Sequence, residues 1–478
     1  MSSIKSIKEL TFQYVISLKN NYNPQTLANT NYLLSEGREK VLEILDMPLD
    51  VFCSKYKPYK VRDFVYKNDY FTPRNMFLIH PLYYLYYTYL VFLIANESFR
   101  TEKIDFSNKN MKVYYSGYLD LGFSKKQITE NARYNESYKL FQKEQKIYRG
   151  KPALKIDIKD FFNSIKVKEL IKTIKYLLGN IKYVNNLEEI LEYCGFDYLP
   201  QFHYSIASSI LSQFYLTNFD NKIRELLVRE NLQLIRYVDD MYIIFLDGIE
   251  DRKRNNAILN EISYYLWEHS LVLNTSKTEM LSVSQYQVIT ESLSENYEDG
   301  NYKGFSSGSL IENKALEIVE GGYLNLIVDT LCNIEEDYGI DLKKYKELME
   351  KYIAINGGEV NKIWNNIIFS EKWKKLDTKE LIGLIKNWEY IFFNPNQFTV
   401  LYLMIYRHLE KSGLVNDNGL RIREVLNYLF KNETFTLRDT LVAISYLFQR
   451  NLKHKDLIQK IKGVNQEYVD FIQSFITD

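Results

Sequence analysis

The sequence lacks the features of a secreted, zinc-binding or membrane-spanning protein. Only three cysteines occur among 478 residues, and Cys53, Cys194 and Cys332 stand far apart with no CxxC pair, which argues against a disulfide framework or a zinc site. The N-terminus has no apolar signal-peptide core. The most apolar stretch, residues 82–95, is short for a bilayer and predicts a buried helix. We therefore expect a cytoplasmic protein with no membrane partner.

An excess of either charge is also missing, because 61 Lys and Arg balance 61 Asp and Glu. Nucleic-acid-binding proteins often have a basic excess, so the whole-chain charge gives no support for that class, although a basic channel offset by acidic surfaces remains compatible with it. The length, with 46% hydrophobic residues, predicts two or three folded domains. Tyr (41) and Phe (27) are numerous, which an AT-rich coding bias explains more simply than base-stacking platforms do.

The pattern along the chain divides it into four parts. Residues 1–150 are helix-rich and aromatic, and residues 151–290 alternate strand-like apolar runs with helical patterns, which predicts an α+β domain. Residues 291–310 are polar and are interpreted as a linker. Residues 311–478 are helical in pattern: Asp377 and Glu380 predict a capping box before an apolar stripe, and residues 437–448 repeat the stripe. We expect a helical bundle or an α-solenoid there.

The central motif is Tyr237-Val238-Asp239-Asp240, between strand-like residues 232–236 and 241–245. An Asp-Asp turn alone is ordinary surface chemistry. Here both arms of the predicted hairpin are largely apolar, so a buried sheet presents adjacent carboxylates at one edge. Such an arrangement is costly unless cations neutralise the charge.

A third acid, Asp157, ends the strand-like run 154–158 and is followed by a predicted helix. Three carboxylates converging with it would hold two Mg²⁺ ions about 4 Å apart, which suits phosphoryl transfer. Asp160 is expected to face solvent or to cap the following helix. Lys277 could protonate departing pyrophosphate as a general acid, or be an ordinary surface lysine in a turn.

The order of these motifs resembles the palm of the reverse transcriptase family, over about residues 60 to 285. The resemblance implies a right-hand polymerase: fingers within residues 1–150, a palm with an antiparallel sheet in residues 151–290, and an all-α C-terminal domain that is thumb-like or an α-solenoid. It implies that Asp157, Asp239 and Asp240 bind two Mg²⁺ ions, for which Mn²⁺ can substitute, and that Lys277 takes part in catalysis.

The same resemblance implies a nucleotide site. Phe162, five residues after Asp157, stands where the family keeps an aromatic steric gate against a ribose 2′-hydroxyl, so deoxynucleotides are expected. Alternatively, Phe161 and Phe162 are core residues, and one of the two is expected to be. Arg74, after Thr72 and Pro73, is expected to hold the triphosphate, because a guanidinium fork suits phosphate. The remaining residues expected at the nucleotide are Ile158, Gln201 and Tyr237.

Basic residues predominate between Tyr138 and Lys155, where Glu144 is the one acid. The basic residues are Lys139, Lys143, Lys146, Arg149, Lys151 and Lys155. This local excess could follow a nucleic-acid backbone, or it could be a solvated helix face.

One segment departs from the family. Residues 198–216 resemble its Leu-Pro-Gln-Gly loop and the following helix, but Tyr198 and Phe202 replace the usual glycines. Glycine there lets the backbone approach nucleotide and template closely. Bulky rings at these positions are therefore expected to disfavour ordinary templated, processive copying.

Two motifs that are missing from the sequence narrow the choice of reverse transcriptase subfamily. No Cys/His cluster suggests an appended nuclease, and there is no Val-Thr-Gly triplet of the retron type. A polymerase fused to a helical C-terminal domain most resembles the bacterial abortive-infection and defence-associated reverse transcriptases. This implies an RNA-directed or template-independent DNA polymerase acting in anti-phage defence, with dNTPs and RNA or DNA as partners. In some members the DNA is attached to a tyrosine.

Other interpretations stay open at this point. The chain could be a retron or mobile-element reverse transcriptase that copies a dedicated non-coding RNA. It could also be a non-catalytic nucleic-acid-binding protein on a polymerase scaffold. The C-terminal helices could mediate homo-oligomerisation or bind another partner.

Overall fold

The computed structural model describes residues 4–21, 24–63, 74–98, 105–134, 136–292, 309–355, 360–415, 420–430 and 455–474. The chain forms two compact units. Unit 1 comprises residues 1–18, 33–62 and 75–298, and unit 2 comprises residues 19–32, 63–74 and 299–478. Residues 293–308 of the expected linker, and the apolar stripe expected at 437–448, lie outside the described residues.

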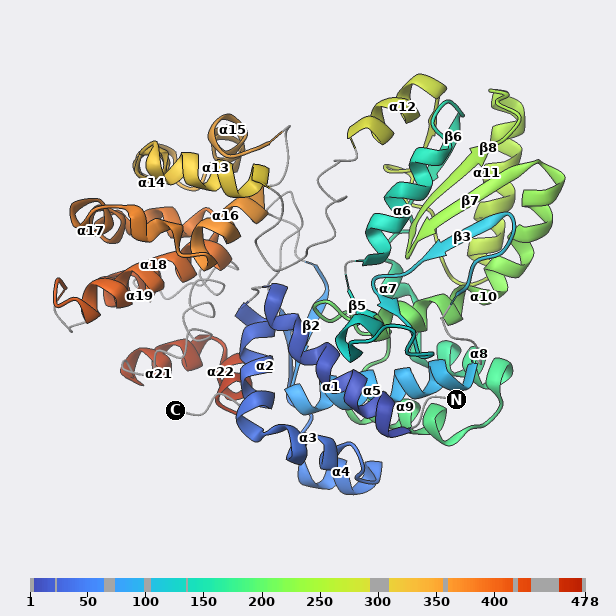
Figure 1. Ribbon diagram of the computed structural model, residues 1–478, viewed down its shortest axis with the longest axis horizontal. Helices are drawn as coiled ribbons and strands as arrows, with labels where there is room; N and C mark the ends of the chain where they lie inside the picture. The colour runs from blue at the N-terminus through green and yellow to red at the C-terminus, as the bar shows by residue number, and fades with distance from the viewer. Residues whose placement is uncertain are drawn as a thin grey trace. The chain divides into compact units, whose positions relative to one another are not determined.

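A five-stranded sheet with the order β3-β7-β8-β6-β9 is the centre of unit 1 (Figure 1). Its strands are β3 (Met111–Tyr114), β6 (Ala153–Ile156), β7 (Leu232–Tyr237), β8 (Asp240–Phe245) and β9 (Glu279–Leu281). β7 and β8 form an antiparallel hairpin that closes at the pair Tyr237–Asp240. β6 is antiparallel to both β8 and β9, whereas β3 adds to the edge of β7 in parallel. The hairpin expected from the apolar runs is therefore present.

Helices cover both faces of this sheet, which explains why its strands are almost continuously apolar. Adjacent residues of a strand point to opposite faces. Arg236 reaches Gln213 of α10 (Ile206–Arg229), while Tyr237 contacts Phe141 of α6 (Glu136–Ile147). Hence α10 covers one face and α6 the other. α12 (Val283–Ser292) joins α6, because Tyr286 belongs to the same buried cluster as Phe141.

The other elements of unit 1 are mainly helical. α5 (Pro81–Ser98) has every residue from Pro81 to Ala95 buried, so its sequence is apolar on all sides. This confirms the prediction of a buried helix. No helix within the described part of the chain is long and apolar enough to cross a membrane. The remaining elements are α1 (Ile4–Ser17), α3 (Arg38–Ile44), α4 (Leu49–Lys55), β1 (Lys60–Asp63), β2 (Met76–Ile79), β4 (Tyr118–Leu119), η2 (Ile128–Asn131), β5 (Ala132–Arg133), α7 (Phe161–Ser164), α8 (Val167–Leu178), α9 (Lys182–Tyr193) and α11 (Arg252–Trp267).

The described residues of unit 2 from Ser309 onwards are mainly helical, as the sequence predicted. Asp377 and Glu380 form the expected capping box at the start of α17 (Thr378–Lys386), and Leu381, Leu384 and Ile385 of the apolar stripe are buried. The other elements are η1 (Leu18–Asn21), α2 (Pro24–Glu36, which continues into unit 1), α13 (Ser309–Glu320), α14 (Tyr323–Tyr338), α15 (Leu342–Tyr352), α16 (Val360–Phe369), η4 (Lys372–Lys375), η5 (Trp388–Phe392), α18 (Pro395–Lys411), α19 (Leu420–Phe430), α21 (Lys455–Val464) and α22 (Gln466–Gln473).

Candidate active site

Asp157 directly follows β6 and is held by the loop that precedes β9. Its side chain is buried, and its two carboxylate oxygens accept hydrogen bonds from Asn274 Nδ2 at 2.7 Å and Lys277 Nζ at 3.1 Å. The backbone N–H of Asn274 also donates to the Asp157 carbonyl at 2.8 Å. The carboxylate is thus fixed from residues more than a hundred positions away. Asp160 is exposed and makes no capping bond with its side chain.

The other two acids lie at the tip of the β7–β8 hairpin. Val238 and Asp239 form the turn, and Asp240 is the first residue of β8. Val238 has φ of 56°, a left-handed conformation that a β-branched residue adopts at a cost of about 1–3 kcal/mol. Its N–H donates to the carbonyl of Tyr114 at the end of β3, at 3.0 Å. β3 therefore supports the turn that presents Asp239.

The three acids interact electrostatically. Burial, with the charges of Asp240 and Asp157, raises the pKa of Asp239 to about 7, although Lys277 acts in the opposite direction. Burial and the charge of Asp157 also raise the pKa of Asp240, against the lowering effects of Lys277 and Lys155. Because Asp239 is half-buried and Asp240 is exposed at the surface, water weakens both effects. Negative charge is thus concentrated at one end of the sheet.

The donor set suits a hard divalent cation, because carboxylate oxygens are the ligands that Mg²⁺ prefers. Such a cation would neutralise the negative charge whose repulsion raises the pKa of Asp239 and of Asp240. Within the described residues, no three or more His, Cys, Asp or Glu side chains are grouped closely enough to hold a metal ion. The acids therefore approach one another without forming a closed ligand shell, and Lys277 and Asn274 occupy the oxygens of Asp157.

Two parts of the chain match known protein families. Residues 117–306 match the sequence model of the family described as reverse transcriptase (RNA-dependent DNA polymerase). The chain carries a reverse transcriptase domain. Residues 316–473 match a second family, described as a domain of unknown function (DUF8609). No curated protein matches the chain.

The reverse transcriptase domain makes the protein an enzyme, a DNA nucleotidyltransferase, and supports RNA-directed DNA polymerase activity. Nucleic acid and deoxynucleoside triphosphates are the substrates that such a domain implies. Asp157 and four strands of the sheet, β6 to β9, lie within the matched residues, whereas β3 precedes them. The helical part of unit 2 carries the second match.

Two residues predicted at the nucleotide lie next to Asp157. Phe161 is 3% exposed and belongs to the core, whereas Phe162 is half-buried, so the two neighbours occupy different environments as expected. Ile158 is buried and forms a bridge with Leu273, which ties this part of the reverse transcriptase domain to the loop carrying Asn274. Of the two phenylalanine rings, only that of Phe162 is therefore partly exposed.

The loop that departs from the family is turned partly inwards. Phe202 is 5% exposed and packs on the rings of Tyr84 and Tyr87 at 5.8 and 5.6 Å. Tyr198 is 45% exposed. Gln201 is half-buried, and its carbonyl accepts the N–H of Phe77 in β2 at 2.9 Å. The ring of Phe202 thus fills the core rather than the space above the loop.

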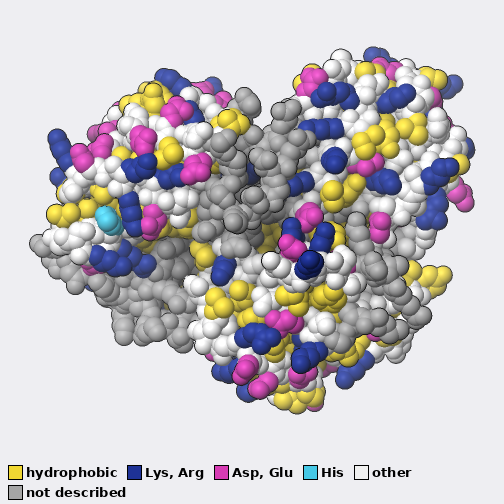
Figure 2. All heavy atoms as spheres, viewed as in Figure 1, with side chains coloured by type: hydrophobic (Ala, Val, Ile, Leu, Met, Phe, Trp, Pro, Cys, Tyr) yellow, Lys and Arg dark blue, Asp and Glu magenta, His cyan; other side chains and the backbone are white. Residues whose placement is uncertain are grey.

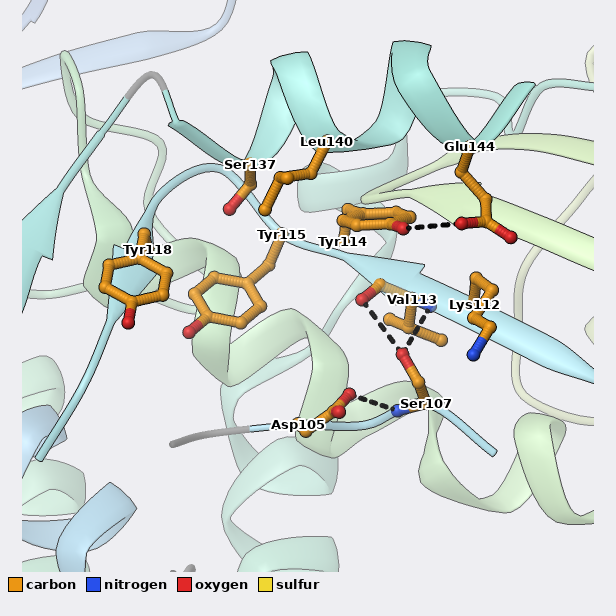
Figure 3. Close-up of a pocket in the computed structure, with 10 residues that line it drawn as sticks. All are labelled: Asp105, Ser107, Lys112, Val113, Tyr114, Tyr115, Tyr118, Ser137, Leu140 and Glu144. Carbon is orange, nitrogen blue, oxygen red and sulfur yellow. Dashed lines mark hydrogen bonds between the residues drawn. The ribbon is translucent and has the colours of Figure 1, made fainter. Parts of the chain in front are cut away.

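Tyr237 packs under the start of α6, with its ring 5.0 Å from that of Tyr138 and 5.4 Å from that of Phe141. Beside it, β3, α6 and the segment with Asp105 and Ser107 line a partly open cavity of about 220 Å³ (Figure 3). Tyr114 lines this cavity and donates a long hydrogen bond of 3.4 Å from its hydroxyl to Glu144. Arg74 is exposed, and Thr72 and Pro73 lie outside the described residues, so its role stays a prediction.

Two polar residues of the site were given no role by the motifs, Asn274 and Arg236. Arg236 is 0% exposed, and its guanidinium donates to Gln213 and Asp220 of α10 and, at 3.2 Å, to the carbonyl of Val238. A charged residue inside an apolar strand is the sequence signal that could have indicated it. For Asn274, whose partner is 117 positions away, the sequence offers no comparable signal.

Proposed function

We propose that the protein is an Mg²⁺-dependent DNA polymerase of right-hand architecture, in which Asp157, Asp239 and Asp240 bind two cations. The observation that carries this proposal is that Asp157 lies close enough to the hairpin acids for its charge to raise the pKa of both Asp239 and Asp240, although it comes from a distant segment of the chain. When bound, the cations supply activation of a primer 3′-hydroxyl and neutralisation of the triphosphate charge. Mn²⁺ is expected to substitute.

The chain's own residues have separate tasks in this proposal. Asn274 orients the Asp157 carboxylate, and Lys277 holds it until a cation arrives. Lys277 is 63% exposed at its side chain, so it is free to turn towards pyrophosphate and donate a proton. Phe162 would exclude a ribose 2′-hydroxyl, with Ile158, Gln201 and Tyr237 around the nucleotide.

We also infer a path for the nucleic acid along α6. Lys139, Lys143 and Lys146 recur every three or four residues, so they share one face of the helix, which is not the face packed on the sheet. α6 begins beside the catalytic hairpin, where Tyr138 contacts Tyr237, and from there the lysines extend over about 10 Å. Lys and Arg side chains gather over this part of unit 1 (Figure 2).

The biological role we propose is anti-phage defence, through DNA made with or without a template and attached in part to a tyrosine. The support is the union of a reverse transcriptase domain with a helical region of a different family. Sequencing nucleic acid that co-purifies with the protein, and testing its 5′ end for a tyrosine link, distinguishes this role from copying of a dedicated non-coding RNA. A single structured RNA as the bound species would favour the retron-like alternative.

The C-terminal helices are the part we propose for self-association or a further partner. Leu326 and Tyr338 of α14 are 45% and 64% exposed. Sedimentation of the full chain would show this as a mass above that of one copy, and a strictly monomeric protein at all concentrations would refute self-association.

Catalysis is tested by Asp239→Asn in the purified full-length protein. Incorporation of dNTPs should fall about a thousandfold or more, because loss of a metal ligand removes several kcal/mol of transition-state stabilisation. Asp160→Asn, an exposed acid three residues after Asp157, is the matched control and should incorporate normally. Equal incorporation by the Asp239→Asn variant and the wild type would exclude the assignment of Asp239, whereas no incorporation by the wild type would favour a non-catalytic scaffold.

A further inference from the structure

The carbonyl and the N–H of Val238 are both bonded within the protein. The N–H donates a hydrogen bond to the carbonyl of Tyr114 in β3, and the carbonyl accepts one from the Arg236 guanidinium at 3.2 Å. Val238 has the left-handed φ of 56° and directly precedes Asp239. A β-branched residue leaves this conformation unless its surroundings impose it. The tight two-residue turn requires it here, and these two hydrogen bonds hold the Val238 backbone in it.

The ion pair of Arg236 with Asp220 contributes less to the argument than the hydrogen bond from Arg236 to the Val238 carbonyl. It is fully buried and donates from Nη2 to Asp220 Oδ2 at 2.6 Å. Arg236 Nε and Asp220 Oδ1 have no hydrogen-bond partner within the described residues. A buried ion pair left incomplete in this way is often no more stabilising than two apolar side chains of similar size. The contact that apolar side chains could not reproduce is the one to the Val238 carbonyl.

We propose that Arg236 is a positioning residue, which holds the Val238 carbonyl so that Asp239 is presented to the cations. The inference rests on the proposed function, because it takes Asp239 as a metal ligand. The guanidinium is needed for its shape: its planar fork serves α10 and the turn at the same time. A lysine keeps the charge opposite Asp220 but has no second arm for the turn.

Arg236→Lys tests this, with Arg254→Lys as the matched control. Arg254 braces the other end of the same hairpin, donating to Asp247 at 2.7 Å and to the carbonyl of Glu230. Both variants of the full chain are compared by thermal unfolding, by titration with Mn²⁺ and by steady-state dNTP incorporation. Arg236→Lys should bind Mn²⁺ about tenfold more weakly and have a lower kcat with little change in KM, because a hydrogen bond from a charged donor is lost.

Arg254→Lys should show a comparable loss of stability with unchanged Mn²⁺ affinity. Equal Mn²⁺ affinities for the two variants would overturn the proposal. A wild-type protein that binds no Mn²⁺ would instead overturn the proposed function, so the two failures are distinguishable.

Glycine adopts the left-handed conformation without a steric penalty, so it reduces the need for the brace. Val238→Gly combined with Arg236→Lys should regain most of the Mn²⁺ affinity lost by Arg236→Lys alone, and no regain would contradict the proposed route through Val238. If Arg236→Lys does not fold, Arg236→Met with Asp220→Leu replaces the pair by apolar side chains. That variant should fold, because no unpaired charge is left buried, and should still bind Mn²⁺ weakly; wild-type affinity would refute the proposal.

Discussion

The charge concentrated at the hairpin should make the metal-free protein less stable as the pH rises. Asp239 has a pKa of about 7 in the folded protein, against its ordinary value of 3.8. Between these values the folded state binds more protons than the unfolded state, so the free energy of unfolding falls with increasing pH. The penalty is absent below the unfolded pKa and complete above the folded one. Asp239→Asn removes it.

The size of the effect follows from the shift. Taken in full, it would amount to about 4 kcal/mol at high pH. Asp239 is half-buried and coupled to two other acids, so about half of this is a better expectation. Of that, about 1 kcal/mol falls between about pH 5.5 and about pH 8.5, where the folded carboxyl loses its proton.

Urea unfolding of the wild type, Asp239→Asn and the control Asp160→Asn, all in EDTA, measures this difference at the two pH values. The stability of Asp239→Asn relative to the wild type should increase by about 1 kcal/mol from the lower to the higher pH. Adding Mg²⁺ should restore the wild type and not Asp239→Asn, since a bound ion neutralises the charge. A difference that is the same at both pH values would refute the reasoning.

Two further predictions concern the choice of nucleotide and the binding of single-stranded nucleic acid. Phe162→Ala should reduce the preference for dNTPs over rNTPs, measured as the ratio of kcat/KM values, and an unchanged ratio would place the gate elsewhere. Replacing Lys139, Lys143 and Lys146 by Gln should lower the salt slope of single-stranded oligonucleotide binding by about 2, because each phosphate contact contributes about 0.7. The same replacement at the exposed Lys168 and Lys172 of α8 should leave the slope unaltered, and an equal effect of both sets would refute a path along α6.

Features carried by neighbouring residues could be predicted from the sequence alone. The two strands around Tyr237 and Asp240, the capping box at Asp377 and the buried helix at residues 82–95 were all predicted correctly. Each depends on periodicity or on residues a few positions apart, which act through local backbone geometry. The reverse transcriptase motifs were recognisable for the same reason, since each is a short run of residues.

Contacts between distant segments were decided by the tertiary structure. The parallel addition of β3 to β7, the bond from Asn274 to Asp157, the inward turn of Phe202 and the burial of Arg236 against Asp220 have no local pattern that specifies them. Each follows from which surfaces the folded chain brings together, and a single sequence does not encode that choice in any one stretch. The sequence by itself therefore determined which side chains could do the chemistry. The packing of α6, α10 and β3 around the hairpin determined how the chain holds them.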